Sequence, residues 1–273
     1  MTRPKNGLYG RDLVPSNRGT TSMTSPLNPR LRLDQLLVER GFFATRARAR
    51  DAILRGTVRV GEAVAERPGQ PVGVDARIVV EDPARCYVSR AALKLVHGLD
   101  AFGLDPCGAR ALDIGASTGG FTQVLLERGA AHVVAIDVGT GQMDARLRED
   151  ERVTCLEGVN ARHLTLEEIG GHRPDFLVGD VSFISLKLAL PPALAMAESG
   201  AHGLFLVKPQ FEAGREAIGK GGLLRDPEKA EEIAHEIAAW LQTNDGWHVL
   251  GLVPSPIEGG DGNREFLLAA RKQ

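Results

Sequence analysis

One short stretch, residues 112–121, constrains the fold more than any other part of the chain. An apolar run ends there at Asp113, turns through glycines and continues into a segment with helical spacing. The next apolar run, residues 132–136, ends at a second acidic residue, Asp137. A strand, a glycine turn, a helix and a strand closed by an acid form a nucleotide-binding crevice at the carboxyl edge of a parallel sheet. We therefore expect an α/β fold with a ligand over this turn.

Three ligands are compatible with the turn. A dinucleotide would be crowded, because Ser117 stands where the G-x-G-x-x-G pattern needs its second glycine. The run from Gly115 to Gly119 also matches the G-x-S-x-G nucleophile elbow of α/β-hydrolases, but that elbow does not need an acid closing the following strand. S-adenosylmethionine fits best, with its ribose on Asp137 and its methionine end over the glycines. A turn that serves only packing is the remaining alternative.

The charge of the chain is divided unevenly along its length. The net charge is −2, but residues 1–60 carry 12 Lys/Arg against 4 Asp/Glu, whereas residues 61–273 carry 21 against 31. A basic region joined to an acidic remainder indicates a polyanionic partner for the basic part.

Several classes of protein are disfavoured by composition. The three cysteines lie far apart without a C-x-x-C pair, so we expect neither a disulfide framework nor a metal site. No run reaches the ~18 apolar residues of a membrane helix, and the N-terminus lacks the apolar core of a signal peptide. We expect a cytoplasmic monomer that binds no membrane and no metal.

The N-terminal third divides into a tail, a small domain and a connector. Residues 1–30 are rich in Pro, Ser, Thr, Asn and Gly, which predicts a disordered tail. Residues 31–80 predict a small α+β domain, with helically spaced leucines, a second helix over 46–55 capped by Thr45, and short strands after it. Residues 81–88 form a connector. The arginine-rich second helix favours RNA binding, although a solvated basic helix is the alternative.

Strands and helices alternate over residues 89–273, as a doubly wound sheet requires. We expect strands at 110–114, 132–137, 153–156, 175–180, 203–208, 247–253 and 265–271. The last two are expected to be antiparallel at one edge. Helices are expected over 90–102, 121–128 and 227–241.

Four charged residues fall at or beside the ligand-binding edge of this sheet. Asp180 and Lys208 each close an expected strand, Glu265 opens the last strand, and Lys94 lies on the helix that precedes the sheet. A lysine at the end of an apolar strand is unusual, because burying an ammonium group without a partner is costly. A site in which Asp180 and Glu265 offset the lysines explains the pattern, and an exposed loop lysine is the alternative.

The basic region resembles a known RNA-binding motif. Arg32-Leu33-Asp34, Thr45-Arg46-Ala47-Arg48-Ala49 and Gly56-x-Val58-x-Val60 resemble the αL motif of a small-subunit ribosomal protein, pseudouridine synthases and tyrosyl-tRNA synthetase. The glycine-rich loop at 214–225 is a further basic segment that either closes over RNA or is an ordinary surface loop. The candidate RNA contacts are Arg32, Arg46, Arg48, Arg50, Arg55, Arg90 and Lys220.

The second resemblance concerns the four charged residues. Lys94, Asp180, Lys208 and Glu265 match, in order and placement, the catalytic K-D-K-E tetrad of FtsJ-like ribose 2′-O-methyltransferases. Residues 31–273 as a whole resemble the TlyA family, whose members are described both as hemolysins and as rRNA methyltransferases. The resemblance implies a seven-stranded Rossmann-like methyltransferase sheet with an N-terminal RNA-binding domain, S-adenosylmethionine as cofactor, and ribosomal subunits as partners.

The implied reaction is methylation of a cytidine ribose in rRNA. The candidate cofactor contacts are Asp113, Gly115, Ser117, Gly119, Gly120, Phe121, Asp137, Val138, Asn160 and Asp180. Three alternatives stay open: a hydrolase with Ser117 as nucleophile, a non-catalytic ribosome-assembly factor, and a hemolysin. The missing signal peptide and membrane span argue against direct pore formation.

Overall fold

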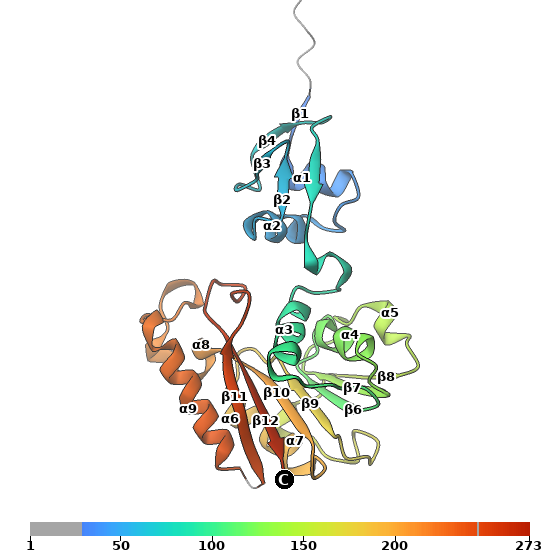
Figure 1. The fold of residues 1–273 in the computed structure, drawn as a ribbon, viewed down its shortest axis with the longest axis vertical. Coiled ribbons are helices and arrows are strands. Elements are labelled where there is room, and N and C mark those ends of the chain that lie inside the picture. Colours follow the sequence, from blue (N-terminus) through green and yellow to red (C-terminus); the bar gives the residue numbers. More distant parts are fainter. Residues whose placement is uncertain (1–28, 245) are drawn as a thin grey trace, which may run out of the picture. The chain divides into compact units, whose positions relative to one another are not determined.

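The computed structural model of the protein describes residues 29–244 and 246–273 (Figure 1). The chain divides into two compact units, with the division between Glu81 and Asp82. The disordered tail predicted for residues 1–30 lies outside the described residues except at its end, where Arg30 begins a strand.

The N-terminal unit is a small α+β fold. Its elements are β1 (Arg30–Arg32), α1 (Leu33–Glu39), α2 (Arg46–Leu54), β2 (Val58–Val60), β3 (Ala63–Val64), β4 (Pro71–Gly73) and β5 (Ile78–Val80). Strand β1 pairs with β4, and β3, β2 and β5 form a separate antiparallel sheet in that order. The Thr45 side chain accepts a hydrogen bond of 3.3 Å from the backbone N–H of Arg48, so Thr45 caps α2. Ala49, Ala52 and Ile53 of α2 are buried in the core of this unit.

The larger unit contains one seven-stranded sheet. Its helices are η1 (Pro83–Cys86), α3 (Ala92–Phe102), α4 (Gly120–Glu127), α5 (Ala145–Arg148), η2 (Ala161–His163), α6 (Leu186–Ala189), α7 (Pro191–Met196), α8 (Pro209–Glu212), η3 (Arg215–Ala217), η4 (Lys220–Gly222), η5 (Pro227–Lys229) and α9 (Ala230–Gln242). Its strands are β6 (Arg110–Ile114), β7 (His132–Asp137), β8 (Val153–Glu157), β9 (Phe176–Gly179), β10 (His202–Val207), β11 (Trp247–Pro254) and β12 (Phe266–Lys272). Each strand lies within one residue of the predicted bounds at either end.

The strand order explains where a ligand can bind. The order is β11-β12-β10-β9-β6-β7-β8. Strand β12 is antiparallel to both of its neighbours, β10 and β11, and the other neighbouring strands are parallel. The order reverses at β6, since the chain moves outward to β7 and β8 and then crosses back to β9. Ligands of such sheets bind at the carboxyl ends of the strands beside this reversal. The glycine turn that follows β6 lies at this position.

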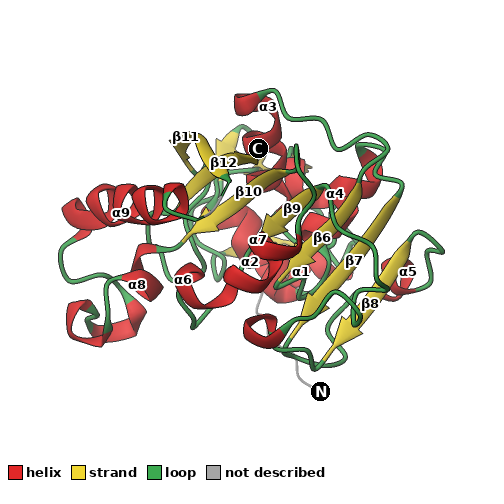
Figure 2. Ribbon diagram, turned by 90° about the horizontal axis from the view of Figure 1, so that it is seen from below, coloured by secondary structure: helices red, strands yellow, loops and turns green. Residues whose placement is uncertain are grey.

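Helices cover both faces of the sheet (Figure 2). Helices α3 and α4 pack on one face through Leu95, Leu99 and Leu125. Helices α6, α7 and α9 pack on the other face, where Ile237 of α9 lies in the same core as Leu112 of β6. The predicted doubly wound architecture is therefore confirmed.

Two helices begin two or three residues later than predicted. The helix expected from residue 90 begins at Ala92, because Ser89 Oγ accepts from the backbone N–H of Ala91 and holds a turn before the helix. The helix expected from residue 227 begins at Ala230 and is preceded by the 3-10 turn η5. Within the part of the chain that the structure describes, every helix is too short or too polar to cross a bilayer.

Candidate active site

The four charged residues of the predicted tetrad form two ion pairs. Lys94 Nζ on α3 lies 2.5 Å from Glu265 Oε2, and Lys208 Nζ lies 2.6 Å from Asp180 Oδ1. Val207 and Phe266 are register partners in β10 and β12, so Lys208 and Glu265 occupy adjacent positions at the same edge. The structure thus brings the members of each pair together from segments far apart in the sequence.

Both lysines are nearly inaccessible to solvent. Lys94 is 5% exposed, Lys208 is 8% exposed and Glu265 is 4% exposed. A buried ion pair contributes little net stability, but removing one partner leaves an uncompensated charge and is strongly destabilising. Lys208 Nζ also donates to Ser182 Oγ at 2.8 Å, which fixes its direction. The two ammonium groups are therefore held in place at the edge of the sheet.

Glu265 is positioned by the loop that precedes β12. A Cβ atom at Gly259 would lie 2.6 Å from Glu265 Oε1, so a side chain at residue 259 would force this carboxylate to move. Asn263, which is 6% exposed, accepts from the backbone N–H of Leu224 and donates to the carbonyl of Gly222. The end of the glycine-rich 214–225 loop is therefore tied to the segment that carries Glu265. Asn263 was not among the residues predicted from the sequence.

The loops after β9 and β10 are joined along their length. The ring of Phe183 contacts that of Phe211, with centroids 5.1 Å apart. Glu212 accepts hydrogen bonds from Ser185 Oγ and from the backbone N–H of Leu186, at 2.5 and 2.8 Å. Burial raises the pKa of Glu212 despite these hydrogen bonds.

Phe183 itself has two unusual properties. It is 91% exposed and has a φ of 65°, a left-handed conformation that is rare for an aromatic residue. Such strain persists only where the surrounding structure enforces it, and it is concentrated at functional sites. The joined loops thus present an aromatic ring to solvent next to Lys208.

The glycine turn between β6 and α4 packs against the ends of two strands, β7 and β9. Gly115 has a φ of 84°, and a Cβ atom there would lie 2.8 Å from the carbonyl oxygen of Asp180. The backbone N–H of Ser117 donates to Asp137 Oδ2 at 2.8 Å. The turn therefore connects the end of β9 to the end of β7, and it brings together three of the predicted cofactor contacts with Gly115.

The remaining residues of the turn differ in their availability. Gly119 precedes the first residue of α4, Gly120, and has a φ of 92°. The ring of Phe121 is buried in the core and is 3% exposed. The ring of Phe121 is therefore not available to a ligand at this turn.

Asp113 lies buried beneath the turn. Thr122 Oγ1 donates to its Oδ2 at 2.6 Å, and Oδ1 has no hydrogen-bond partner among the described residues. Burial raises the pKa of Asp113 to about 7 against the effect of the Thr122 hydrogen bond, and the nearby carboxylates of Asp180 and Asp137 raise it further. The site therefore contains an unpaired acceptor and three acidic groups, which together favour a cationic ligand.

The segment after β7 forms the other wall of the site. Val138 is 74% exposed, and Asn160 lies in the segment after β8, where its Oδ1 accepts from the backbone N–H of Arg162. Glu157 at the end of β8 accepts from the backbone N–H groups of Gly141 and Gln142, and these hydrogen bonds lower its pKa. Glu157 was not among the residues predicted from the sequence, although Glu157 closes an apolar strand as Asp137 does.

The predicted RNA contacts of the N-terminal unit are not equivalent. Arg32 and Arg46 both form ion pairs with the buried carboxylate of Asp34, at 3.1 and 2.9 Å. Arg55 pairs with Asp51 at 2.9 Å, whereas Arg50 is exposed on α2. In this unit, Arg32 and Arg46 therefore combine a structural ion pair with partial exposure.

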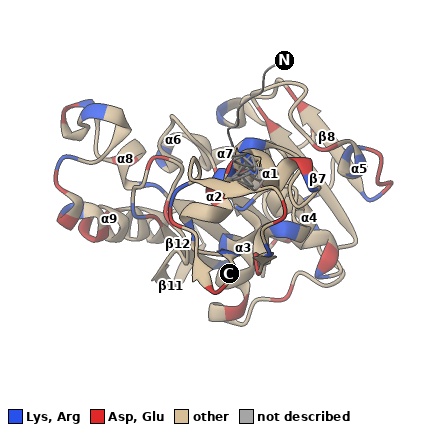
Figure 3. Cartoon of the chain, turned by 90° about the horizontal axis from the view of Figure 1, so that it is seen from above, with Lys and Arg blue, Asp and Glu red and all other residues tan. Residues whose placement is uncertain are grey.

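Arg48 of α2 and Arg90 before α3 are half-buried, whereas Lys220 is exposed in η4. In the larger unit, several acidic residues lie on α9 (Figure 3), namely Glu231, Glu232 and Glu236. This helix is therefore an unfavourable surface for phosphate groups.

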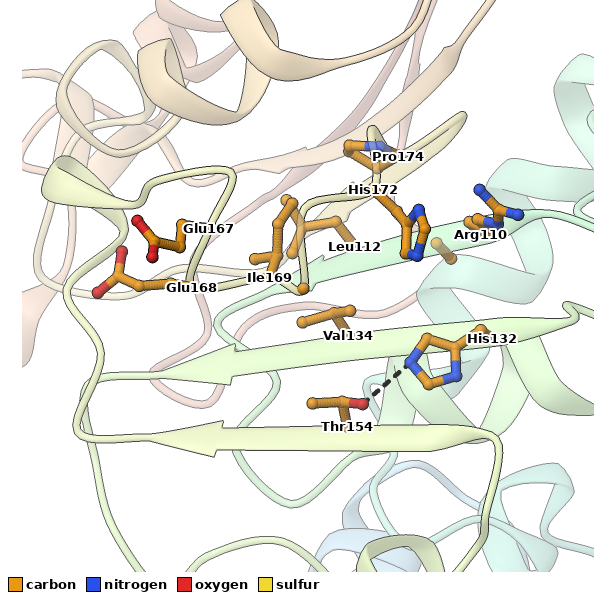
Figure 4. A pocket seen from close by; sticks show the side chains of 12 residues that line it. Arg110, Leu112, His132, Val134, Thr154, Glu167, Glu168, Ile169, His172 and Pro174 are labelled. Carbon is orange, nitrogen blue, oxygen red and sulfur yellow. Dashed lines mark hydrogen bonds between the residues drawn. The ribbon is translucent and has the colours of Figure 1, made fainter.

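A cavity of about 380 Å³ is lined by residues of β6, β7 and β8 and of the segment that precedes β9, and not by the tetrad (Figure 4 shows the lining). Its lining includes Arg110 and His132, the first residues of β6 and β7, so it lies toward the amino ends of strands whose carboxyl ends form the site. His132 Nε2 and Thr154 Oγ1 share a hydrogen bond of 3.0 Å within it. This cavity is therefore at the other end of these strands from the candidate active site.

The hydrolase alternative finds no support in the hydrogen bonds of Ser117. Its hydroxyl donates to Gln142 Oε1 at 3.0 Å, whereas an activated serine needs a general base at that position. The fold and the site instead define a Rossmann-like methyltransferase, because the acid that ends β7 and the two lysine–carboxylate pairs flank one glycine turn.

Comparisons with known proteins agree with this class. Residues 87–272 match the FtsJ-like methyltransferase family and residues 31–78 match the S4 domain. The chain is 47% identical over 245 residues to the 16S/23S rRNA (cytidine-2′-O)-methyltransferase TlyA of Mycobacterium tuberculosis (strain CDC 1551 / Oshkosh), covering 89% of this chain and 91% of that one. It is 37% identical over 238 residues to Hemolysin A of Brachyspira hyodysenteriae, covering 87% and 98%.

A solved structure from Streptococcus thermophilus is similar over the whole fold. It has a TM-score of 0.69 and 39% identity, and the match covers 90% of each chain. The chain therefore belongs to the TlyA family of FtsJ-like methyltransferases.

Proposed function

We propose that the protein transfers a methyl group from S-adenosylmethionine to a ribose 2′-hydroxyl of ribosomal RNA. The observation that carries the proposal is the pair of buried lysine–carboxylate contacts beside the glycine turn, at 2.5 and 2.6 Å. The mycobacterial relative, which is named for cytidine 2′-O-methylation of 16S and 23S rRNA, supports cytidine as the target nucleoside.

The residues around the turn fit S-adenosylmethionine. This cofactor has a ribose diol, a cationic sulfonium, an ammonium group and a carboxylate. Asp137 would accept from the diol, and the exposed side chain of Val138 would contact the adenine. The free acceptor of Asp113, with Asp180 nearby, suits the cationic groups. The first N–H groups of α4 suit the carboxylate.

The tetrad would activate the ribose hydroxyl for attack on the methyl group. A 2′-hydroxyl is a poor nucleophile, so its proton must be removed or the developing alkoxide must be stabilised. We assign this role to Lys208, which Asp180 and Ser182 hold in one direction. Lys94, held by Glu265, orients the hydroxyl and adds positive potential at the alkoxide. The sulfonium of the bound cofactor makes the methyl group electrophilic, and the rest of the catalysis is alignment.

The exposed ring of Phe183 supports a nucleic acid substrate. Aromatic side chains stack on unpaired bases, and sequence-specific RNA recognition commonly uses such bases. Phe183, supported by Phe211, would stack on the base of the target nucleotide while Lys208 contacts its ribose. The S4 domain would supply phosphate contacts through Arg50 and its neighbours.

Mapping of ribose methylation on rRNA tests the proposal in cells. A strain that lacks the protein is expected to lose 2′-O-methylation at one or more cytidines, and the wild-type gene is expected to restore it. The Lys208→Ala variant is expected not to restore it. An unchanged methylation map in the deletion strain would overturn the proposal.

A further inference from the structure

The side chain of Gln142 occupies a position at the edge of the cofactor site that the proposed function does not use. Its Oε1 accepts from Ser117 Oγ at 3.0 Å, so it spans from the segment after β7 to the glycine turn. Its Nε2 has no hydrogen-bond partner among the described residues. Gln142 therefore presents a free amide donor at the mouth of the site.

The backbone is arranged to admit this side chain. A Cβ atom at Gly139 would lie 1.9 Å from Gln142 Nε2 and 3.1 Å from Asp137 Oδ1. The free donor and the ribose-binding carboxylate are thus both next to residue 139. A side chain at residue 139 would therefore force the Gln142 amide to move.

Gln142 is also held firmly at its own backbone. Its N–H donates to Glu157 Oε1 at 2.9 Å, and the N–H of Gly141 donates to Glu157 Oε2 at 2.7 Å. Gly139 N–H donates to Asp137 Oδ1 at 2.7 Å. The carboxylates at the ends of two adjacent strands therefore fix the loop from which Gln142 extends, and little ordering entropy is lost when a ligand binds.

The chemistry of a ribose explains why a donor is needed beside Asp137. Each hydroxyl of a vicinal diol can donate one hydrogen bond and also accept. The carboxylate of Asp137 can only accept hydrogen bonds, so the hydroxyl oxygens of the diol still lack a donor. An amide N–H next to that carboxylate supplies this donor.

We infer that Gln142 is a cofactor-binding residue. Its Nε2 donates a hydrogen bond to a ribose hydroxyl, and the same hydroxyl donates to Asp137. Asp137 and Gln142 then recognise the diol as acceptor and donor, and Ser117 orients the amide from the other side. The inference rests on the proposed function, because it takes an adenosyl cofactor as the ligand.

Calorimetry with S-adenosylhomocysteine tests the inference without any methyl transfer. The Gln142→Ala variant is expected to bind about three- to tenfold more weakly than the wild type, as the loss of one neutral hydrogen bond predicts. Gln142→Glu keeps an acceptor for Ser117 but loses the donor, so it is expected to bind at least as weakly. Gln35→Ala is the matched control, because that amide also makes one side-chain hydrogen bond, to Glu39 at 2.8 Å in the other unit.

An analogue of S-adenosylhomocysteine with a 2′,3′-dideoxyribose separates recognition from a structural role. With this analogue the wild type and Gln142→Ala are expected to bind equally, since the hydroxyls are absent. Equal weakening for both ligands, or unchanged or tighter binding of S-adenosylhomocysteine by Gln142→Ala, would overturn the inference alone. Failure of the wild type to bind S-adenosylhomocysteine would overturn the proposed function as well.

Discussion

Two fully buried aspartates, one in each unit, show how partners decide the role of a charge. Asp34 in the N-terminal unit and Asp113 in the larger unit are both 0% exposed. Burial raises the pKa of Asp34, but hydrogen bonds from the Arg32 and Arg46 guanidinium groups outweigh it and lower the pKa to about 2. Asp113 has one hydroxyl partner and two neighbouring carboxylates, and burial raises its pKa to about 7.

The contrast separates a structural acid from an acid in a ligand site. The charge of Asp34 is neutralised within the fold, so its contribution to stability is present above pH 4 and is lost as the pH falls toward 2. Asp113 forms no ion pair with the residues that the structure describes, and a cationic ligand would supply a counter-charge. Proteins accept such unfavourable arrangements where they serve binding or catalysis.

The largest expected effect comes from removing a cation from the acid-rich site. Lys208→Ala is expected to lower the single-turnover rate of methyl transfer by about 10²- to 10⁴-fold, the usual range for a group that acts on the proton of a nucleophile. Affinity for S-adenosylhomocysteine is expected to change little, because the proposed role of Lys208 is on the hydroxyl rather than on the adenosine. A near-normal rate in rapid-quench measurements would remove Lys208 from its assigned role.

Asp113→Asn tests the acid whose charge is unpaired. Because the folded-state pKa lies above the ordinary value of 3.8, wild-type stability from this group is greatest at low pH and is lost as the pH rises toward 7. The free energy of unfolding of the variant relative to the wild type is expected to increase by about 3 kcal/mol between pH 5 and pH 8. Urea unfolding at the two pH values measures this difference. A difference that is constant with pH would show that Asp113 is ionised throughout.

Asp137→Ala tests the acid that is assigned to the ribose. Loss of charge-assisted hydrogen bonds is expected to weaken S-adenosylhomocysteine binding by about 1.5–3 kcal/mol. Thermal unfolding of the ligand-free variant serves as a control, because Asp137 also accepts from the backbone N–H groups of Ser117 and Gly139. Unchanged affinity in calorimetry, with the fold intact, would exclude Asp137 from the ribose contact.

The smallest effects are expected at two arginines of α2, Arg46 and Arg50. Arg50→Ala should reduce the magnitude of the salt slope of RNA binding by about 0.7–0.9, the value for one phosphate contact. Arg46→Ala should have this effect and also raise the pKa of Asp34, since one of its two cations is lost. Filter binding at several salt concentrations measures the first effect, and acid unfolding measures the second. Identical acid unfolding of the two variants would contradict the structural assignment of Arg46.

Much of the larger unit is readable from the sequence because its signals are local. Apolar runs closed by acids or lysines define the parallel strands, and their order places Asp180 and Lys208 at one edge. The small strands β1 and β4 carry no such signal, since each has three residues and β4 begins with Pro71. They exist only because they pair with each other across about 40 residues of chain.

The residues that support the site were missed for a related reason. Asn263 accepts a hydrogen bond from the backbone N–H of Leu224, and Glu157 accepts one from that of Gly141. Because these partners are distant in the sequence, neither contact can be inferred from neighbouring residues. Glu157 nevertheless had a signal, since an acid closes its apolar strand. Asn263 had none, because a polar loop residue is usually a turn or surface residue.

Methyl transfer to ribosomal subunits in vitro tests the central claim most directly. The full chain is incubated with S-adenosylmethionine that carries an isotope-labelled methyl group and with purified ribosomal subunits, and the rRNA is then digested to nucleosides for mass spectrometry. The isotope label is expected in 2′-O-methylcytidine with the wild type, and no label is expected there with Lys208→Ala. Label on a base, or equal labelling by the two proteins, would contradict the proposed function.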